Sequence, residues 1–448
     1  MPEGLRVCRA SQRPLAALLA VALAGCAVQT APSPTRALPS PSATRVALSS
    51  PPPRLGPGDS PTPTPLIVPP PPGVPADPQT HGSRFLRSEP PRAALQARLE
   101  KLVAYYGMPG VSVTILWPGG YEWTGVAGVT DVATGQKLST DTGFALGSIS
   151  KTYTAANTLK LVEEGFLRLD DSAARYLPAL KLDPLITIRM LLEHTSGLPD
   201  YFLDGSIDRS LQARPDATWS TKQTLRYVRK ALFPPGRRWV YSNTNYLLLG
   251  MIDEVVDGRP LAFQIRARFL DPLGLDQTWT QVVEQPRAGT ARGHQLFGRP
   301  RARTAWPVYD GGAVMPFRSV VTAAGGAGDM AATSRDAARW LEDLVLGNVL
   351  RAQTRDEMLR EALYTDAIGA RIPYGLGIQV GQLGDRPAIG HTGRLLGFRA
   401  IVRVLPVERM TIAVLTNQST LDPTLIAKSL LRLALPRVSD CGVCPTIL

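Results

Sequence analysis

The sequence predicts a mixed α/β (α+β) fold, with strands at both ends of one folded unit and a mostly helical region between them. Two strand-like runs near one end, 111–117 and 121–129, flank a Pro-Gly-Gly hairpin signal. Three further strand-like runs, 375–380, 398–404 and 410–416, lie near the other end. Because helix signals fill the chain between these groups, we expect strands from the two ends of the folded unit to pair and close one sheet.

Helices are expected before, between and after these strands. The first covers 92–106, and a second runs from about Ser148 to Glu164 and stops at Gly165. Further helices are expected over 187–194, 221–232, 245–257, 334–346 and 422–434. The folded unit, 92–436, holds about 350 residues, which is ample for a sizeable core.

The first 25 residues have the order of a secretory signal. Three arginines precede an apolar run, Leu15–Leu23, which is too short to span a bilayer. The Leu-Ala-Gly-Cys that ends at Cys26 resembles the bacterial lipoprotein box, in which the signal, 1–25, is removed and the cysteine is lipidated. The alternative is an ordinary signal peptide with an incidental cysteine. The lipoprotein interpretation predicts an exported protein that is lipid-anchored to the bacterial cell envelope.

A proline-rich tether is expected to follow, over 26–91. Of the 41 prolines, 19 lie between positions 31 and 91, where Phe85 is the single aromatic residue. Such a stretch cannot bury enough apolar surface to fold. A polyproline spacer of this length would reach on the order of 200 Å, which suits a folded domain held off a membrane. The alternative is a proline-rich ligand for a partner domain.

The composition argues against nucleic acid as a partner. The formal net charge is +12, and the basic residues are 41 arginines and 8 lysines. The sequence has no basic run and no interleaving of basic with aromatic residues, the pattern that nucleic-acid binding favours. The excess charge fits a solvated basic surface, which an anionic wall or membrane can attract.

Cysteine and histidine usage indicates no metal or redox centre. Cys441 and Cys444 form a C-x-x-C in a C-terminal tail, 437–448, where they could close a small disulfide outside the cytoplasm. A redox function needs a thioredoxin-like context, which the sequence lacks. The histidines are scattered, so we expect no metal site and no cofactor. They are His81, His194, His294 and His391.

Ser148 and Lys151 stand three residues apart at the start of an expected helix, which brings both side chains to one face. A serine hydroxyl becomes a strong nucleophile only when a neighbouring group takes its proton. A lysine amine can do so when burial or nearby positive charge depresses its pKa, whereas arginine does not deprotonate in proteins. Ser150 would point elsewhere, so Ser148 is the expected nucleophile. Taken alone, the pair also fits a capped helix with a solvated lysine.

A second stretch, Tyr-Ser-Asn, carries polar side chains that could complete such a site. Tyr241 and Asn243 follow a Pro-Pro-Gly turn just before the helix expected over 245–257. A tyrosine hydroxyl can shuttle a proton when a nearby cation lowers its pKa. Asn243 can accept a hydrogen bond from Lys151 while it donates to a substrate carbonyl. Taken alone, the stretch also fits an asparagine cap with a packed tyrosine.

A third stretch, Gly-His-Thr-Gly at 390–393, falls between strand-like runs. Its glycines let a backbone approach a ligand closely, and a strand edge here would offer N–H and C=O groups to an extended substrate. Thr392 and a protonated or neutral His391 can contact a substrate carboxylate. Taken alone, the stretch also fits a surface turn.

The three stretches, in this order, resemble the three motifs of the serine β-lactamase and D-alanyl-D-alanine carboxypeptidase family, in a class C-like form. Two supporting stretches also look familial, Phe-Ala-Leu-Gly-Ser ending at Ser148 and Leu-Leu-Glu-His-Thr-Ser-Gly-Leu over 191–198. The resemblance covers roughly residues 93–435. It implies a β-lactamase/transpeptidase-like fold, with an antiparallel sheet packed between helices, an all-helical subdomain and a site between the two.

The resemblance also implies a role for each matching residue. Ser148 would be acylated, and Lys151 and Tyr241 would be the proton-transfer pair, with the choice of base left open. Asn243 would orient Lys151 and the substrate amide. His194 is expected to be structural. In the third motif, His391 and Thr392 would hold the anionic end of the substrate beside Gly393, and the backbone N–H groups of Ser148 and Arg394 would form an oxyanion hole.

One departure from the family pattern bears on the substrate. The third motif often begins with lysine in β-lactamases, but here it begins with His391, as in some carboxypeptidases, D-amino-acid peptidases and esterases. The leading hypothesis is a serine hydrolase that cleaves D-amino-acid cell-wall peptides through an acyl-enzyme. The alternatives are a β-lactamase-like esterase or β-lactamase, and a penicillin- or wall-binding protein that barely turns over. The expected partners are a peptide, ester or β-lactam substrate, and a membrane through the lipid anchor.

Overall fold

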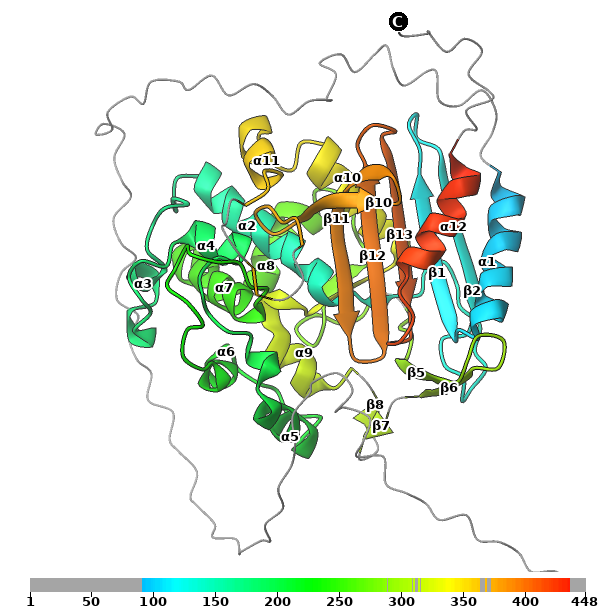
Figure 1. Cartoon of the computed structure of the whole chain (residues 1–448), viewed down its shortest axis with the longest axis horizontal. Coiled ribbons are helices and arrows are strands. Elements are labelled where there is room, and N and C mark those ends of the chain that lie inside the picture. Colours follow the sequence, from blue (N-terminus) through cyan, green and yellow to red (C-terminus); the bar gives the residue numbers. More distant parts are fainter. Residues whose placement is uncertain are drawn as a thin grey trace, which may run out of the picture.

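The computed structural model describes residues 91–435, apart from 288, 308, 311–312, 315, 363–366 and 369–371. In Figure 1 a sheet stands beside a large helical region, with further helices packed on the sheet. Within the described residues, every helix falls short of the length and apolarity that crossing a bilayer demands. The expected signal segment with Cys26, the tether, and the tail with Cys441 and Cys444 lie outside the described residues.

A six-stranded antiparallel sheet forms the frame of the domain, with strand order β10-β11-β12-β13-β1-β2. Its strands are β1 (Gly110–Leu116), β2 (Glu122–Gly128), β10 (Gln379–Leu383), β11 (Arg386–Leu395), β12 (Phe398–Leu405) and β13 (Met410–Thr416). β1 pairs with β2 across the predicted hairpin and with β13 on its other side, where Val111 lies opposite Thr416. The prediction that both ends of the folded unit close one sheet is confirmed.

Both faces of this sheet are buried, because side chains along each strand alternate between two cores. On β13, Val414 belongs to one hydrophobic cluster and its neighbour Leu415 to the other. The first face packs against α1 (Arg92–Tyr106) and α12 (Thr424–Ala434), which lie side by side in Figure 1. The opposite face packs against α10 (Ser334–Leu346). The bounds of α1 and α10 agree with those predicted.

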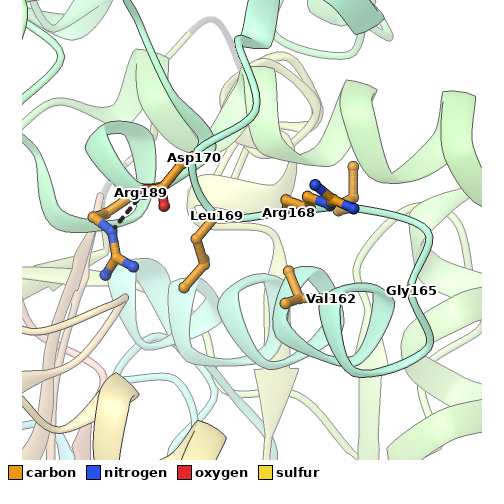
Figure 2. Close-up of a pocket in the computed structure, with 7 residues that line it drawn as sticks. Val162, Gly165, Arg168, Leu169, Asp170 and Arg189 are labelled. Carbon is orange, nitrogen blue, oxygen red and sulfur yellow. Dashed lines mark hydrogen bonds and ion pairs between the residues drawn. The ribbon is translucent and has the colours of Figure 1, made fainter. Parts of the chain in front are cut away.

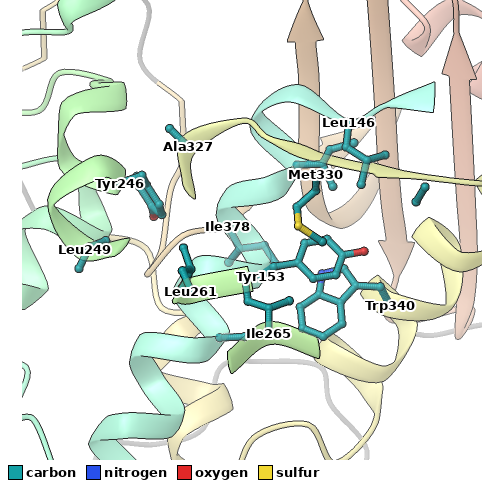
Figure 3. Packing of buried hydrophobic residues seen from close by; sticks show 14 of the residues in the cluster. Leu146, Tyr153, Tyr246, Leu249, Leu261, Ile265, Ala327, Met330, Trp340 and Ile378 are labelled. Atoms are coloured by element: carbon teal, nitrogen blue, oxygen red, sulfur yellow. The ribbon is translucent and has the colours of Figure 1, made fainter. Parts of the chain in front are cut away.

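Helix α2 (Ser150–Glu163) is buried along most of its length. Its Tyr153 ring stacks on Trp340 of α10, with the ring centroids 4.1 Å apart, and Trp340 Nε1 donates to Thr152 Oγ1 at 2.8 Å. Figure 3 shows Tyr153 and Trp340 together, with Met330 packed beside them. Because the serine of the first motif lies just before α2, this packing fixes its position.

The helical region and its connections complete the described chain. The helices are α3 (Ala173–Tyr176), α4 (Ile188–Glu193), α5 (Gly205–Ala213), α6 (Thr221–Thr224), α7 (Asn243–Asp257), α8 (Leu261–Ile265) with a π-helical turn (Arg266–Leu270), α9 (Arg318–Ala324) and α11 (Ala352–Met358). Short 3₁₀ turns lie at Gly147–Ile149, Pro178–Leu180, Tyr201–Leu203, Leu225–Tyr227 and Gly325–Ala327. A three-stranded sheet has the order β3 (Phe144–Ala145), β9 (Met330–Ala332), β4 (Thr278–Thr280). Two strand pairs complete the described chain, β5 (His294–Phe297) with β6 (Thr304–Pro307) and β7 (Tyr309–Asp310) with β8 (Ala313–Val314).

The helix expected over 221–232 is shorter than predicted. It ends at Thr224 and continues only as a 3₁₀ turn. Beyond this turn the chain is no longer helical, and the Leu232 N–H donates to the Gly197 carbonyl oxygen at 2.9 Å. A tertiary hydrogen bond therefore overrides the local helix signal.

The strand predictions around the third motif also need correction. The strand expected over 375–380 begins only at Gln379, because the chain turns at Gly377, with φ 87°, against α2. A Cβ at Gly377 would lie 2.2 Å from Ala155 Cβ, so only glycine fits this passage. The stretch 390–393, expected between strands, lies within β11. Its glycines are poor strand formers, which hid the strand in the sequence.

Candidate active site

The serine of the first motif lies in a tight turn between β3 and α2. Gly147 adopts a left-handed φ of 52° and opens the 3₁₀ turn that carries Ser148. Ser148 is half-buried, whereas Ser150 is fully buried and its Oγ accepts a hydrogen bond from the Met330 N–H at 3.0 Å. Of the two serines, Ser148 is the less buried, and its Oγ lies next to the Lys151 amine.

Lys151 is buried one helical turn after Ser148. Its Nζ lies 3.0 Å from Ser148 Oγ, 2.6 Å from Asn243 Oδ1 and 2.7 Å from the Ala327 carbonyl oxygen. The centroid of the Tyr241 ring is 5.0 Å from the same nitrogen. The structure therefore brings the first two motifs together around one amine.

The surroundings of Lys151 are those of a base. Burial lowers the pKa of Lys151 to about 7, although nearby carboxylates act in the opposite direction. At neutral pH much of the amine is therefore uncharged, with two N–H donors and one lone pair. The Asn243 and Ala327 oxygens can only accept, so they take the two donors. The lone pair is then left facing Ser148 Oγ.

Asn243 begins helix α7, and its amide is held in one orientation. Its Nδ2 donates to Asp200 Oδ2 at 2.7 Å, so its Oδ1 faces Lys151. Asp200 Oδ1 accepts from the Phe202 N–H at 3.0 Å, which fixes the carboxylate in turn. Sequence reasoning missed Asp200. The available signal was its place two residues after the familial stretch 191–198.

The Tyr241 hydroxyl is buried next to the Ser148 hydroxyl. Burial raises the pKa of Tyr241, and the neighbouring Ser148 hydroxyl lowers it by less. The phenol therefore keeps its proton at neutral pH. Tyr241 is thus suited to donate a proton and Lys151 to take one.

His391 of β11 is buried, and both of its ring nitrogens have protein partners. Nδ1 lies 2.6 Å from the Thr392 carbonyl oxygen, which can only accept, so Nδ1 carries a proton. Nε2 lies 2.9 Å from the Tyr374 hydroxyl, which sequence reasoning did not single out. Burial lowers the pKa of His391 to about 3, so the ring is neutral and Nε2 accepts from Tyr374.

This geometry corrects the expected role of His391. A neutral ring with both nitrogens occupied offers no charged donor to the anionic end of a substrate. Of the two forms left open by the sequence, only the neutral one fits. His391 instead holds the Tyr374 hydroxyl in place beside the site. Thr392, in contrast, is half-buried and keeps a hydroxyl at the edge of β11.

A matched pair of substrates should reveal this neutral histidine. For one substrate with a free carboxylate and one with its methyl ester, we expect parallel profiles of kcat/KM between about pH 5 and pH 8. A histidine with a pKa near ~6.5 would favour the free acid increasingly as the pH falls. Titration of Lys151 affects both substrates, so only the difference between the profiles counts. A gain for the acid that His391→Lys flattens would contradict the neutral assignment.

Two glycines let the third motif approach the first. A Cβ at Gly393 would lie 2.0 Å from the Leu146 carbonyl oxygen, and one at Gly147 would lie 2.6 Å from the Arg394 carbonyl oxygen. Neither position has room for a side chain, so β11 runs directly against the turn that carries Ser148. The backbones of Ser148 and Arg394 are therefore close neighbours, while the Arg394 side chain is exposed.

His194 supports the site from behind and does not enter it. It is fully buried at the end of α4, and its Nδ1 accepts from the Ser242 N–H at 3.3 Å, with Asn245 Nδ2 at 3.1 Å. Burial lowers the pKa of His194 well below its usual value. Its ring centroid is 4.4 Å from that of Tyr241. The geometry agrees with the structural role expected from sequence.

The cavity in Figure 2 lies elsewhere. It has a volume of about 490 Å³ at the far end of α2, and Figure 2 shows Arg189 paired with Asp170, 3.2 Å apart. A helix of 14 residues is about 20 Å long, so this cavity is well separated from Ser148. No three His, Cys, Asp or Glu side chains in the described part of the chain are grouped to hold a metal ion.

Comparison with protein families agrees with the geometry of the three motifs. A family model described as Beta-lactamase matches residues 95–435, which include all three. The chain belongs to the β-lactamase family. The β-lactamase/transpeptidase-like fold predicted from the motifs is confirmed, with mixed helices and antiparallel sheet.

Relatives of this β-lactamase family member include a penicillin-binding protein and a D-aminopeptidase. Penicillin-binding protein 4 of Amycolatopsis lactamdurans is 31% identical over 337 residues, which cover 72% of this chain and 84% of that protein. A D-aminopeptidase of Brucella anthropi is 26% identical, over 68% of this chain and 56% of that protein.

Solved structures of related proteins point the same way. The D-stereospecific amidohydrolase from Streptomyces sp. is 28% identical with a TM-score of 0.64, and the match covers 79% of this chain and 100% of that one. The D-amino acid amidase from Ochrobactrum anthropi SV3, complexed with L-phenylalanine, is 26% identical with a TM-score of 0.65. The match covers 76% of this chain and 97% of that one. Together these findings support a serine hydrolase of the β-lactamase fold.

Proposed function

We propose that the protein cleaves D-amino-acid peptides of the cell wall through an acyl-enzyme, as a D-alanyl-D-alanine carboxypeptidase or D-amino-acid peptidase. The observation that carries this proposal is the contact of Ser148 Oγ with the buried amine of Lys151 at 3.0 Å. The substrate class is supported by relatives named as a penicillin-binding protein, a D-aminopeptidase and a D-amino acid amidase.

In the proposed acylation, uncharged Lys151 takes the proton of Ser148 as Oγ attacks the scissile carbonyl carbon. The charge that develops on the carbonyl oxygen is stabilised by the backbone N–H groups of Ser148 and Arg394. Tyr241 gives its proton to the leaving amine as the C–N bond breaks, and then recovers a proton from Lys151. The net transfer moves the serine proton to the amine and leaves an ester on Ser148.

Deacylation reverses these roles. A water molecule attacks the ester carbonyl and gives its proton to Lys151, after which Ser148 leaves with a proton and the acid product is released. Throughout both steps, Asp200 keeps the Asn243 amide turned toward Lys151. No metal or cofactor is needed to balance either step.

Three substrates, compared side by side, test this proposal. They are a D-Ala-D-Ala peptide, a nitrophenyl ester and a chromogenic cephalosporin. We expect D-alanine release from the peptide with continuous turnover. Turnover of the ester alone would favour the esterase alternative, and fast turnover of the cephalosporin would favour a β-lactamase. Stoichiometric acylation without turnover would favour a penicillin- or wall-binding protein.

We also propose export and anchoring to the cell envelope through lipid on Cys26, supported by the order of charged, apolar and small residues before it. Cys26→Ser should then move the protein from the membrane fraction to the soluble fraction, because buried acyl chains supply the binding, about 0.8 kcal/mol per CH₂. Cys8→Ser is the matched control, since Cys8 lies in the segment that processing removes. A processed Cys26→Ser protein that stays membrane-bound would refute the anchor.

A further inference from the structure

Two helices on one side of the main sheet share a basic outer surface. α1 and α12 pack on the sheet and on each other through a common hydrophobic cluster. Away from that cluster, exposed side chains recur at helical spacing on both helices. We call these six residues the α1–α12 face: Arg98, Lys101, Tyr105, Leu425, Lys428 and Arg432. Within the described residues, none of its four basic side chains is paired with a carboxylate.

The one acidic residue of the two helices is turned away from this face. Glu100 of α1 accepts a hydrogen bond from Gln96 Nε2 at 2.9 Å, and the same nitrogen donates to the Val126 carbonyl oxygen of β2 at 3.0 Å. Because α1 packs over β2 and α12 packs over β13, Glu100 lies on the flank of α1 that is remote from α12. The four positive charges therefore face solvent without a negative charge among them.

A fifth cation and two apolar groups extend the face. The Arg301 N–H donates to the Tyr105 carbonyl oxygen at 2.7 Å, and its guanidinium carbon lies 5.1 Å from the centroid of the Tyr105 ring. Tyr105 is 42% exposed and Leu425 is 44% exposed. Cations beside exposed aromatic and aliphatic groups are typical of helices that lie at the headgroup level of a membrane.

The place of the face in the chain favours a membrane as its partner over bulk solvent. α1 begins at Arg92, directly after the proposed tether, 26–91, which starts at the proposed lipid site, Cys26. A tethered domain meets its membrane in an intramolecular event, so weak attraction is enough to hold it there. Each Lys or Arg near an anionic membrane strengthens binding by about fivefold. The charge of the face complements anionic phospholipid headgroups.

We propose that the α1–α12 face, together with Arg301, docks the domain on the anionic phospholipid surface of the membrane that holds the anchor. The basic side chains bind phosphate headgroups, and Tyr105 and Leu425 enter the interface. The inference goes beyond the proposed hydrolase function, and it uses the proposed anchor only to bring the domain to a membrane.

Docking in this way sets the orientation of the active site. Helix α10 packs on the sheet face opposite α1 and α12, and α2 stacks on α10 through Tyr153 and Trp340. In Figure 1, α1 and α12 lie at one end of the molecule and the helical region lies at the other. A docked domain therefore keeps Ser148, at the start of α2, turned away from the membrane, toward substrates on the other side.

Lysine footprinting on vesicles tests the face directly. The full-length chain carries Cys26→Ser, so that no lipid can supply the binding. It is treated with N-hydroxysuccinimidyl acetate in the presence of phosphatidylglycerol–phosphatidylcholine vesicles or of phosphatidylcholine vesicles. We expect anionic vesicles alone to slow acetylation of Lys101 and Lys428 severalfold, while Lys222 and Lys230, exposed in the helical region, keep their rates. Salt at ~1 M, where the Debye length is about 3 Å, should remove the protection.

Two double variants of the same chain separate the face from net charge. Lys101→Gln with Lys428→Gln should weaken binding to anionic vesicles by about 25-fold, about fivefold for each cation lost. Lys222→Gln with Lys230→Gln removes the same charge elsewhere and should bind like the parent chain. Both variants should unfold at the parent temperature, because all four side chains are exposed.

The proposal is overturned if anionic vesicles bind the chain but leave Lys101 and Lys428 unprotected, since another segment would then supply the binding. It is also overturned if both double variants weaken binding equally, because net charge would then explain it. Protection that appears without vesicles as the protein concentration rises would assign the face to a second copy instead. Membrane retention of Cys26→Ser in cells bears on the anchor alone, and loss of hydrolase activity bears on neither.

Discussion

Ser148→Ala is expected to abolish covalent labelling of the protein by a fluorescent penicillin or a fluorophosphonate. The substitution removes the oxygen that forms the acyl bond, and loss of the nucleophile in a serine hydrolase costs on the order of 10⁶ in kcat. The fold should survive, because Ser148 is half-buried and its side chain contacts Lys151 at the surface of the core. Labelling gels, intact mass and thermal unfolding of the purified variant measure both effects.

Ser150→Ala is the matched control for this experiment. It keeps Ser148 and should therefore keep labelling, but it removes the bond that Ser150 Oγ accepts from the Met330 N–H. Its free energy of unfolding should fall by about 1 kcal/mol. Persistent labelling of Ser148→Ala, or a mass adduct mapped to Ser150, would refute the assignment of the nucleophile.

Lys151→Arg is expected to be nearly as damaging as Lys151→Ala. Loss of a general base typically removes about 10²–10⁴ in rate, and a guanidinium cannot accept the serine proton. The larger head group also has little space, because oxygens of Asn243 and Ala327 lie 2.6 and 2.7 Å from the present amine. The acylation rate constant with a penicillin or an ester is the quantity to compare.

Lys160→Arg is the matched control on the same helix, because Lys160 pairs with Glu163 near the surface and should tolerate the change. If Lys151→Arg kept most of its acylation rate, Lys151 would serve only as a fixed charge and Tyr241 would be the base.

The pH dependence of acylation gives a second measure of the same base. Since burial lowers the pKa of Lys151 to about 7, the fraction of uncharged amine rises as the pH increases through 7. The acylation rate for a neutral ester should rise over the same interval and level off above it. Burial raises the pKa of Tyr241, so the phenol does not titrate in that range. A rate that falls as the pH rises through 7 would contradict Lys151 as the base.

The sequence predicted the helices and strands that have a clear pattern within their own residues, and the site residues that lie close together in the chain. Helix α10 and the β1–β2 hairpin have strong periodic or turn signals, and Ser148 and Lys151 meet because one helical turn separates them. The sequence did not predict strand β11. The turn that carries Ser148 lies so close to Gly393 that only glycine fits there, and glycine is a poor strand former.

The remaining site residues depend on tertiary contacts that no local pattern reports. Asp200 belongs to no motif, and it contacts the site through Asn243, a side chain far away in sequence. The neutral state of His391 follows from its burial and from Tyr374, which fixes the ring. A histidine in a sequence motif has no defined charge until its surroundings are known.

The pairing of β1 with β13 also shapes how the domain folds. Residues that face each other across these strands, such as Val111 and Thr416, are roughly 300 residues apart in the chain. Loop-closure entropy opposes such a contact, and folds rich in distant contacts fold slowly. Until the last strands have been synthesised, β1 keeps an unpaired apolar edge and α1 lacks α12, with which it packs. The nascent chain therefore exposes an unpaired apolar strand edge, a feature that favours aggregation, until β13 has been synthesised.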